Sequence, residues 1–209
     1  MSDEVRVNGR DKIGAVVLAA GRSARMGEAK QLLRVNGRTL LEQALTGVPG
    51  SDVNAVVLVL GYAAEQIQRE LSPELLGEVT IVVNKSYEEG MSSSVRVGLA
   101  ALGPQIDAAL VVLADQPLVK PETMCSIIRT YKHSSAEIVV PHYKGKRGNP
   151  VLLDRAVFPE AMKLEGDTGF RAIFSSHAAG LLPFDVDDEG VVLDIDSRED
   201  YERVQNRTS

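Results

Sequence analysis

Short runs of aliphatic and β-branched residues recur along the chain and alternate with segments of helical hydrophobic periodicity. The runs are continuously apolar, which is typical of strands buried on both faces of a parallel sheet. They predict strands at Ile13–Leu18, Ala55–Leu60, Val79–Val83, Ala109–Leu113 and Ile138–Val140, with further candidates at Val151–Leu153 and Leu181–Asp185. The intervening segments predict helices at Leu40–Leu45, Ala63–Leu71, Ser93–Leu102, Glu122–Lys132, Asp167–Ser176 and Arg198–Val204. This alternation predicts an α/β fold in three α/β/α layers, Rossmann-like, with a predominantly parallel mixed sheet covered on both faces.

The length and composition predict one soluble domain. The chain has 209 residues, of which 44% are hydrophobic and 25% charged, and both fractions are ordinary for a globular protein. We expect a flexible tail at residues 1–12 and a single domain at 13–205. No apolar run approaches the roughly 20 residues that span a bilayer, and the first residues lack the apolar stretch of a signal peptide. We therefore expect a cytoplasmic protein.

Charge and cysteine content narrow the choice of partners. A net charge of −6 gives no general attraction for nucleic acid or an anionic membrane, so we expect neither as a partner. Any phosphate ligand must then be held by local cations. Cys125 is the only cysteine, and its helical surroundings predict a core position.

Ser92–Ser94 and Thr168 are candidate caps for two of the helices.

A loop rich in small residues and cations follows the first predicted strand. The segment Leu18–Gly21 ends in two alanines and a glycine. Because these residues have small side chains or none, backbone N–H groups can approach a polyanion here. Arg22, Arg25 and Lys30 supply positive charge. The spacing fits neither a Walker A loop nor a dinucleotide fingerprint, since five residues separate Gly21 from Gly27 and no second glycine follows Gly21 at the required position.

The loop resembles the signature of the MobA-like nucleotidyltransferases, in particular their molybdenum cofactor cytidylyltransferase branch. That signature reads Leu-Ala-Ala-Gly, then Arg-Met-Gly, then Lys-Gln-Leu, and it stands here at 18–21, 25–27 and 30–32. The resemblance implies a nucleotide-diphospho-sugar transferase-like fold and transfer of CMP from CTP to molybdenum-loaded molybdopterin, with release of pyrophosphate. It also implies that Lys30, Arg25 and Asp115 are catalytic. Nucleotide binding would involve Leu18, Ala19, Ala20, Gly21, Arg22 and Lys30.

Two aspartates are candidate ligands for Mg²⁺ or Mn²⁺. Asp115 ends an apolar run, so its carboxylate should emerge at the carboxyl end of a strand, where a hard oxygen ligand suits Mg²⁺. A turn aspartate bonded to its own backbone is the alternative, but Leu-Ala-Asp-Gln-Pro resembles the metal-binding motif of the family. Asp196 lies in a segment that resembles the family's Asp-Thr-Pro-Glu-Asp and would be a second ligand. A plain helix cap is the alternative for Asp196.

Three further segments resemble substrate-binding motifs of the family. The loop after the third predicted strand resembles the part that surrounds the base and ribose, which implies that Asn84, Gly90 and Ser94 contact the nucleotide. The segments Arg-Gly-Asn-Pro-Val and Gly-Asp-x-Gly-x-Arg resemble those that line the acceptor side. These two segments supply the acceptor-site candidates Arg147, Asn149, Asp167 and Arg171.

Several alternatives share these sequence features. CTP is favoured over GTP because Ala20 and Ala29 stand where GTP-using members more often carry a glycine and a carboxylate. A molybdopterin guanylyltransferase, or a transferase acting on another phosphate acceptor, would share the architecture. A non-enzymatic accessory protein that binds the nucleotide and inserts cofactor is a further alternative. A molybdoenzyme or its chaperone would be the protein partner that receives the product.

Overall fold

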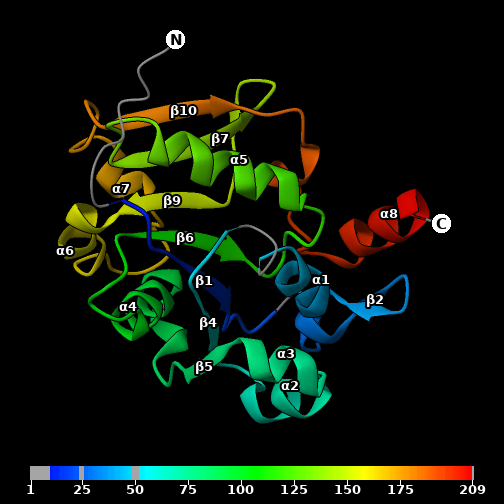
Figure 1. Cartoon of the computed structure of the whole chain (residues 1–209). Coiled ribbons are helices and arrows are strands. Elements are labelled where there is room, and N and C mark those ends of the chain that lie inside the picture. Colours follow the sequence, from blue (N-terminus) through cyan, green and yellow to red (C-terminus); the bar gives the residue numbers. More distant parts are fainter. Residues whose placement is uncertain (1–9, 24–25, 49–51, 209) are drawn as a thin grey trace.

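A computed structural model describes residues 10–23, 26–48 and 52–208. The described residues form an eight-stranded sheet in the order β10-β7-β9-β6-β1-β4-β5, with β8 paired to β7. Figure 1 shows this order from β10 at the top to β5 at the bottom. The strands are β1 (Ile13–Ala19), β4 (Ala55–Leu60), β5 (Thr80–Val83), β6 (Ala108–Leu113), β7 (Ile138–Tyr143), β8 (Lys146–Arg147), β9 (Val151–Asp154) and β10 (Leu181–Asp185).

Strand directions confirm the predominantly parallel mixed sheet. β1 pairs in parallel with both β4 and β6, β4 with β5, and β7 with β10, whereas β9 runs antiparallel to β6 and β7. Leu18 lies opposite Val59 in β4 and opposite Leu113 in β6. The carboxyl ends of β1, β4 and β6 therefore open at one edge of the sheet, where a ligand crevice is expected in this class of fold.

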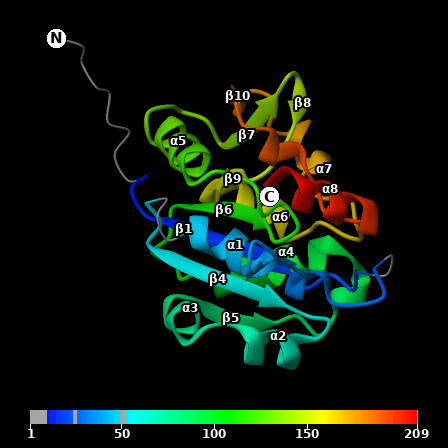
Figure 2. The ribbon, with the colours of Figure 1, turned by 90° about the vertical axis from the view of Figure 1, so that its right-hand side faces the viewer.

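Helices cover both faces and confirm the three layers (Figure 2). Ile13, Ala15 and Val17 of β1 pack into one core with α1 (Leu40–Gly47), α2 (Ala64–Glu70) and α5 (Pro121–Lys132). Val16 and Leu18 pack into the other core with α4 (Met91–Ala101), α6 (Phe158–Ala161) and α7 (Arg171–Phe174). A side-chain period of two along β1 thus supplies both cores.

The remaining elements are short or peripheral. They are η1 (Lys30–Leu32), β2 (Arg34–Val35), β3 (Arg38–Thr39), α3 (Pro73–Glu78), η2 (Tyr87–Glu89), η3 (Arg155–Val157), η4 (Glu189–Val192) and α8 (Arg198–Thr208). β2 and β3 form a separate hairpin. Thr39 begins α1 with a capping box, in which its hydroxyl accepts from the N–H of Glu42 and the Glu42 carboxylate accepts from the N–H of Thr39.

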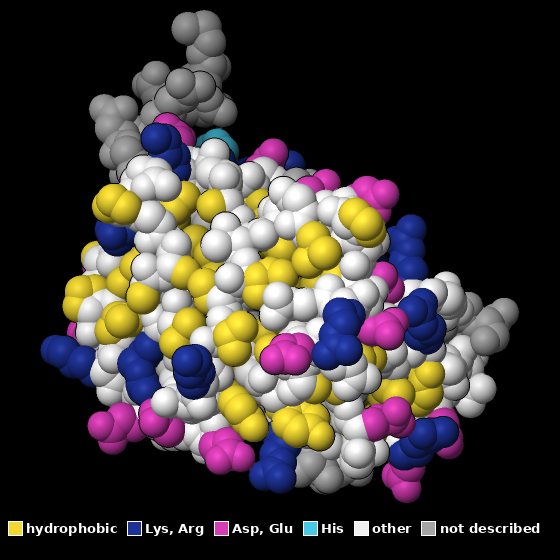
Figure 3. All heavy atoms as spheres, turned by 90° about the horizontal axis from the view of Figure 1, so that it is seen from below, with side chains coloured by type: hydrophobic (Ala, Val, Ile, Leu, Met, Phe, Trp, Pro, Cys, Tyr) yellow, Lys and Arg dark blue, Asp and Glu magenta, His cyan; other side chains and the backbone are white. Residues whose placement is uncertain are grey.

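Apolar side chains are also exposed at the β5 end of the sheet. Val83 in β5 and Leu76 in α3 are among the exposed large hydrophobic residues of the described chain. Figure 3 views the molecule from this side and shows hydrophobic side chains spread over the middle, with charged side chains among and around them. No described helix is both long and apolar enough to cross a membrane.

Three local predictions were wrong. The helix predicted at Asp167–Ser176 is reduced to α7, because Gly169 inside this range adopts positive φ and interrupts the helical backbone. Ser92–Ser94 lie inside α4, whose N-cap is Gly90, and the Thr168 hydroxyl donates to the Glu165 carbonyl instead of capping a helix.

Cys125 and the N-terminal segment also differ from expectation. Cys125 is half-buried, because the buried stripe of α5 follows Met124, Ile127 and Ile128. Arg10 was expected in the flexible tail, whose residues 1–9 lie outside the described part. It instead forms a 3.1 Å ion pair with Asp154 and donates to the carbonyls of Ser134 and Ala136. The packed region thus includes Arg10, three residues before the expected boundary.

Candidate functional site

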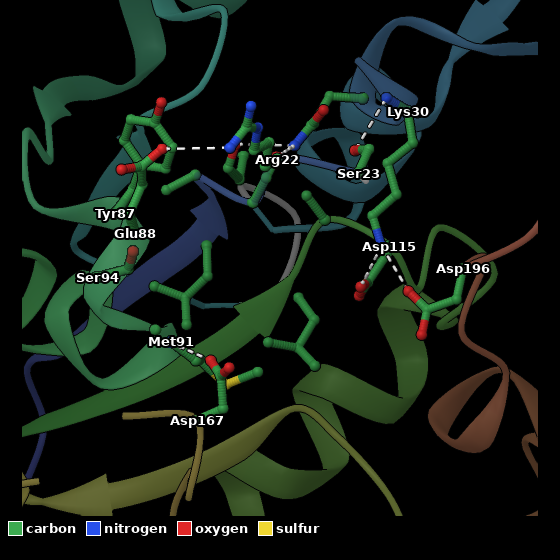
Figure 4. Close-up of a pocket in the computed structure, with 18 residues that line it drawn as sticks. Arg22, Ser23, Lys30, Tyr87, Glu88, Met91, Ser94, Asp115, Asp167 and Asp196 are labelled. Carbon is green, nitrogen blue, oxygen red and sulfur yellow. Dashed lines mark hydrogen bonds and ion pairs between the residues drawn. The ribbon is translucent and has the colours of Figure 1, made fainter. Parts of the chain in front are cut away.

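A cavity of about 560 Å³ lies beyond the carboxyl ends of β1 and β6. Figure 4 shows its walls, with Arg22 and Lys30 on one side and Met91 and Asp167 on another. Residues from distant parts of the chain line it: Leu18, Ala19, Ala20, Gly21, Arg22, Ser23, Lys30, Gln31, Tyr87, Glu88, Gly90, Met91, Ser94, Leu113, Ala114, Asp115, Asp167 and Asp196. The position agrees with the rule that ligands of open α/β sheets bind at the carboxyl ends of strands.

The loop after β1 forms one wall of this cavity. A Cβ added at Gly21 would meet no described atom within 4 Å, so the space beside this residue is open. In the described part of the chain, the N–H groups of Ala20, Gly21 and Arg22 donate no hydrogen bond. Three consecutive donors beside an open cavity suit an anionic ligand such as a phosphate chain. Arg25 lies outside the described residues.

Lys30 reaches across the cavity floor to two carboxylates. Its Nζ lies 2.8 Å from Asp115 Oδ2 and 2.8 Å from Asp196 Oδ1, and its side chain is only 13% exposed. Burial by itself lowers the pKa of Lys30, but the two aspartates outweigh that effect and hold the pKa above its usual value. Lys30 is therefore a firmly charged ammonium at the centre of the site.

The two aspartates could supply some of the ligands of a divalent cation, and other groups would complete its coordination shell. Asp115 Oδ1 is buried and has no hydrogen-bond partner among the described residues, and a buried carboxylate oxygen without a partner is costly. The described residues contain no group of three or more His, Cys, Asp or Glu side chains that could hold a metal. Asp115 and Asp196 would thus supply part of a coordination shell, as is usual for Mg²⁺ bound with substrate phosphates.

A third carboxylate, that of Asp194, lies close to this pair. Gln116 Nε2 donates to Asp194 Oδ1 at 2.6 Å and to the Val191 carbonyl at 3.2 Å. Burial raises the pKa of Asp194, and the charge of Asp115 raises it further. The segment 194–196 thus places the Asp196 carboxylate beside Lys30 and the Asp194 carboxylate beside Gln116.

Asn84 occupies a position that sequence reasoning did not anticipate. It is 2% exposed and does not line the cavity. Its amide donates to the hydroxyls of Ser93 and Ser94 at 2.8 and 3.0 Å, and its carbonyl accepts from the N–H of Ser86. The structure thus gives Asn84 the role of joining the β5 loop to α4, whereas Ser94 lines the cavity as expected.

Gly90 and Asp167 join two segments at the cavity edge. Asp167 Oδ1 accepts from the N–H of Met91 at 2.8 Å. Gly90 has φ of 100°, and a Cβ there would lie 2.5 Å from the carbonyl carbon of Gly166. Only glycine suits this close approach. Asp167, expected on the acceptor side, instead lines the same cavity as the loop after β1.

The other acceptor-site candidates meet in a second pocket. Arg147, Asn149 and Arg171 line a space of about 590 Å³ together with Lys146, Gln116, Val191, Val192 and Asp194. Three cationic side chains make this pocket suitable for an anion. Asp115 lines the first cavity and the adjacent Gln116 lines the second. Consecutive residues of the turn after β6 thus line the two spaces.

Sequence reasoning missed some residues of both spaces. Tyr87, Glu88 and Met91 line the first cavity, and only their place in the loop after β5 signalled this. Gln31 stands inside the Lys-Gln-Leu motif, and Gln116 follows Asp115 directly. Their position beside charged candidates was the signal that could have found them.

The sheet order, the loop after β1 and the pair of carboxylates at Asp115 and Asp196 define a nucleotidyltransferase of the nucleotide-diphospho-sugar transferase fold. Comparison with known families agrees, since the family model described as the MobA-like NTP transferase domain matches residues 15–180. The chain belongs to this family, as the sequence motifs predicted.

Relatives with different activities resemble the chain along most of its length. Nicotine blue oxidoreductase of Paenarthrobacter nicotinovorans is 30% identical over 201 residues, which cover 92% of this chain and 96% of the relative. The molybdenum cofactor cytidylyltransferase of Escherichia coli K12 is 22% identical over 197 residues, covering 93% and 96% of the two chains.

Solved structures show the same fold. The crystal structure of Rv0371c from Mycobacterium tuberculosis H37Rv is 32% identical, with a TM-score of 0.82 over 94% of this chain and 99% of that one. A structure of Rv0371c in complex with manganese is 31% identical, with a TM-score of 0.79 over 93% and 98%.

Proposed function

We propose that this nucleotidyltransferase transfers CMP from CTP to the phosphate of molybdenum-loaded molybdopterin and releases pyrophosphate. The observation that carries the proposal is the meeting of Lys30, Asp115 and Asp196 in the cavity beyond β1 and β6, with a second pocket that begins at the residue after Asp115. One space is lined by a loop whose Ala20–Arg22 N–H groups have no partner among the described residues, and the other by three cationic side chains and the Asp194 carboxylate. This arrangement suits a nucleoside triphosphate on one side and a phosphorylated acceptor on the other.

The reaction needs alignment and charge compensation more than covalent chemistry. An oxygen of the acceptor phosphate forms a bond to the α-phosphorus, the bond from that phosphorus to the β-phosphate oxygen breaks, and pyrophosphate leaves with the electron pair. Negative charge grows on the equatorial and leaving oxygens, and fixed donors near them lower the barrier. Lys30 and the N–H groups of Ala20–Arg22 would supply those donors, with Arg25 as a further cation.

A divalent cation, Mg²⁺ or Mn²⁺, would be held by Asp115 and Asp196. When bound, it neutralises phosphate charge and orients the triphosphate. The orphaned oxygen of Asp115 supports this assignment. The manganese complex of Rv0371c supports a divalent ion in a relative. Lys30 would hold the two carboxylates in place before the nucleotide arrives.

The acceptor would lie in the second pocket. Arg147 and Arg171 would bind its phosphate, and Asn149 would offer an amide to its polar edge. Asp167 would contribute from the nucleotide side of the junction, where it fixes the start of α4. A molybdenum-loaded pterin phosphate fits these requirements in charge and polarity.

CTP is proposed over GTP on the basis of Ala20 and Ala29, together with the likeness to the cytidylyltransferase of E. coli. Leu18, Ala19, Ser94 and Gly90 would surround the nucleotide. Asn84 would act on base binding through Ser94, which it holds from behind. GTP is the alternative nucleotide substrate, and another phosphorylated molecule is the alternative acceptor.

A second candidate function is oxidoreduction, favoured by the 30% identity to nicotine blue oxidoreductase. The loop after β1 lacks the Gly-x-Gly-x-x-Gly fingerprint of dinucleotide-binding folds, which weighs against it. A third candidate is a binding protein that hands cofactor to a molybdoenzyme or its chaperone without turnover.

One assay separates these candidates. Each nucleoside triphosphate is combined with molybdenum-loaded molybdopterin and Mg²⁺ or Mn²⁺, and pyrophosphate and the dinucleotide product are measured. We expect both products with CTP. Turnover with GTP alone would make GTP the nucleotide substrate in place of CTP. Nucleotide binding without release of pyrophosphate would favour the accessory protein. Redox turnover of nicotine blue, in place of pyrophosphate release, would favour the oxidoreductase.

A further inference from the structure

Gln31 follows the proposed catalytic residue Lys30 and contacts the loop after β1. The proposed reaction gives this side chain no role. Gln31 lies in η1 and is 2% exposed. Its Nε2 donates to the Ala19 carbonyl at 3.0 Å and to the Gly21 carbonyl at 3.0 Å. Both partners are acceptors, so the amide nitrogen must face them.

We propose that Gln31 is a positioning residue that holds residues 19–22 in the form that binds a triphosphate. This inference rests on the proposed nucleotidyl transfer and specifies how the loop is prepared for it. Gln31 itself need not touch the nucleotide.

The geometry of the peptide bond carries the argument. In a trans peptide the N–H points away from the carbonyl of the same peptide unit. Holding the carbonyls of Ala19 and Gly21 therefore also fixes the directions of the Ala20 and Arg22 N–H groups. The peptide between them is held separately, because the N–H of Tyr62 donates to the Ala20 carbonyl at 3.1 Å. Three consecutive peptide units are thus oriented through their carbonyls.

The orientation leaves the N–H donors without partners in the part of the chain that the structure describes. Among the described residues, nothing accepts from the N–H groups of Ala20, Gly21 and Arg22, and these residues line the cavity. Donors fixed before the ligand arrives require no reorganisation when charge develops on the phosphates. A loop free to rotate its peptides would have to be ordered at the cost of affinity.

The loop is also tied at its other end. The N–H of Lys30 donates to the Ser23 hydroxyl at 3.2 Å. The backbone of Lys30 and the side chain of Gln31 therefore hold the two ends of residues 19–23 against η1. Because the ammonium of Lys30 reaches Asp115 from the same short element, η1 fixes the loop relative to the carboxylates.

Gln43 offers a matched control for a glutamine in this role. Its Nε2 also bridges two backbone carbonyls, those of Val35 at 2.9 Å and Arg38 at 3.2 Å. Those carbonyls belong to the β2–β3 hairpin, and Gln43 does not line the cavity. Gln43→Glu therefore removes the same kind of contact without touching the loop after β1.

The test compares ligands that differ in their phosphates. Binding of CTP, inorganic tripolyphosphate and cytidine is measured by calorimetry for the wild type, Gln31→Glu, Gln31→Met and Gln43→Glu, with thermal unfolding as the check on folding. A hydrogen bond typically changes an equilibrium constant by about five- to tenfold. We expect both Gln31 variants to bind CTP and tripolyphosphate at least about tenfold more weakly, with cytidine unchanged and Gln43→Glu like the wild type.

The outcomes distinguish this inference from the proposed function. If Gln31→Glu and Gln31→Met bind CTP and tripolyphosphate as tightly as the wild type, the positioning role is overturned while nucleotidyl transfer stands. An equal loss for cytidine would also overturn it, because the effect would then be general damage to the site. If the folded wild type binds no nucleoside triphosphate and no tripolyphosphate, the proposed function and the inference both fall.

Discussion

Lys30 Nζ lies 2.8 Å from Asp115 Oδ2, although 85 residues separate the two along the chain. η1 carries the lysine after the loop of β1, and the aspartate lies just after β6. Because β1 and β6 are neighbouring parallel strands, their carboxyl ends bring the two segments together. The contact couples the cation that would meet the phosphates to the carboxylate that would bind a metal.

Removing the ammonium tests its role in the transition state. Lys30→Ala should lower kcat by roughly a hundredfold or more, comparable to the loss of one oxyanion donor. Steady-state pyrophosphate release with CTP and acceptor measures this, and Lys85→Ala, a change at an exposed position, provides the control. A rise in KM with unchanged kcat would instead make Lys30 a ground-state binding residue.

Removing one cation from the second pocket tests the acceptor assignment. Arg147→Ala should raise the KM for the acceptor about tenfold, the effect of losing a hydrogen bond to a charged group. The KM for CTP should stay the same, because Arg147 does not line the first cavity. Lys144→Ala removes equal charge from the same hairpin outside the pocket and should leave both constants unchanged. An effect on CTP alone would contradict the assignment.

Gly90 is required by backbone geometry. Gly90→Ala forces a side chain into a positive-φ position 2.5 Å from Gly166, and we expect a loss of about 1–3 kcal/mol in the free energy of unfolding. Gly77→Ala in α3 meets no described atom within 4 Å and should stabilise by up to about 1 kcal/mol. Denaturant unfolding measures both changes. Equal stability of the two variants would contradict the close packing of Gly90.

His177 predicts a pH-dependent contribution to stability. Its Nδ1 lies 2.6 Å from Glu137 Oε2 and its Nε2 3.2 Å from Glu160 Oε1, with the side chain 13% exposed. The hydrogen bond to Glu137 is the main cause that raises the pKa of His177 above 6.5, assisted by the charge of Glu160. Protonated His177 therefore stabilises the fold below pH 6.5, and this contribution is lost as pH rises through the higher native pKa.

The measurement is thermal unfolding across pH. His177→Gln should lower Tm more at pH 6 than at pH 9, whereas His133→Gln, at an exposed position, should show no such difference. Glu160 faces His177 and also accepts a hydrogen bond from Ser176. That hydrogen bond lowers the pKa of Glu160, so its carboxylate stays charged from pH 6 to pH 9. A constant deficit for His177→Gln at all pH values would rule out the charged pair.

The sequence predicted the layers well because buried parallel strands have an unmistakable pattern. The run at 55–60 matches β4 at both ends, since Asn54 precedes its apolar residues and Gly61 follows them. The segment after Gly166 was misjudged because its helical periodicity gives no sign that Gly166 and Gly169 take positive φ. Element type was thus readable from hydrophobic pattern, whereas local backbone interruption was not.

The candidate site was readable where a residue's position on a strand end determines its direction. Asp115 follows β6 and lies in the crevice, as expected from the sheet alone. Asn84 also follows a strand, but its amide turns inward to Ser93 and Ser94. Whether a polar side chain faces a ligand or satisfies a neighbour depends on tertiary contacts, which one sequence does not contain.

We expect nucleotidyl transfer to depend on a divalent cation held by Asp115. Pyrophosphate release from CTP and molybdenum-loaded molybdopterin, measured with Mn²⁺ for the wild type and for Asp115→Asn, tests it most directly. We expect manganese-dependent release by the wild type and loss of that release in Asp115→Asn, which should still fold. Release by Asp115→Asn at the wild-type rate, with the same dependence on manganese, would contradict it.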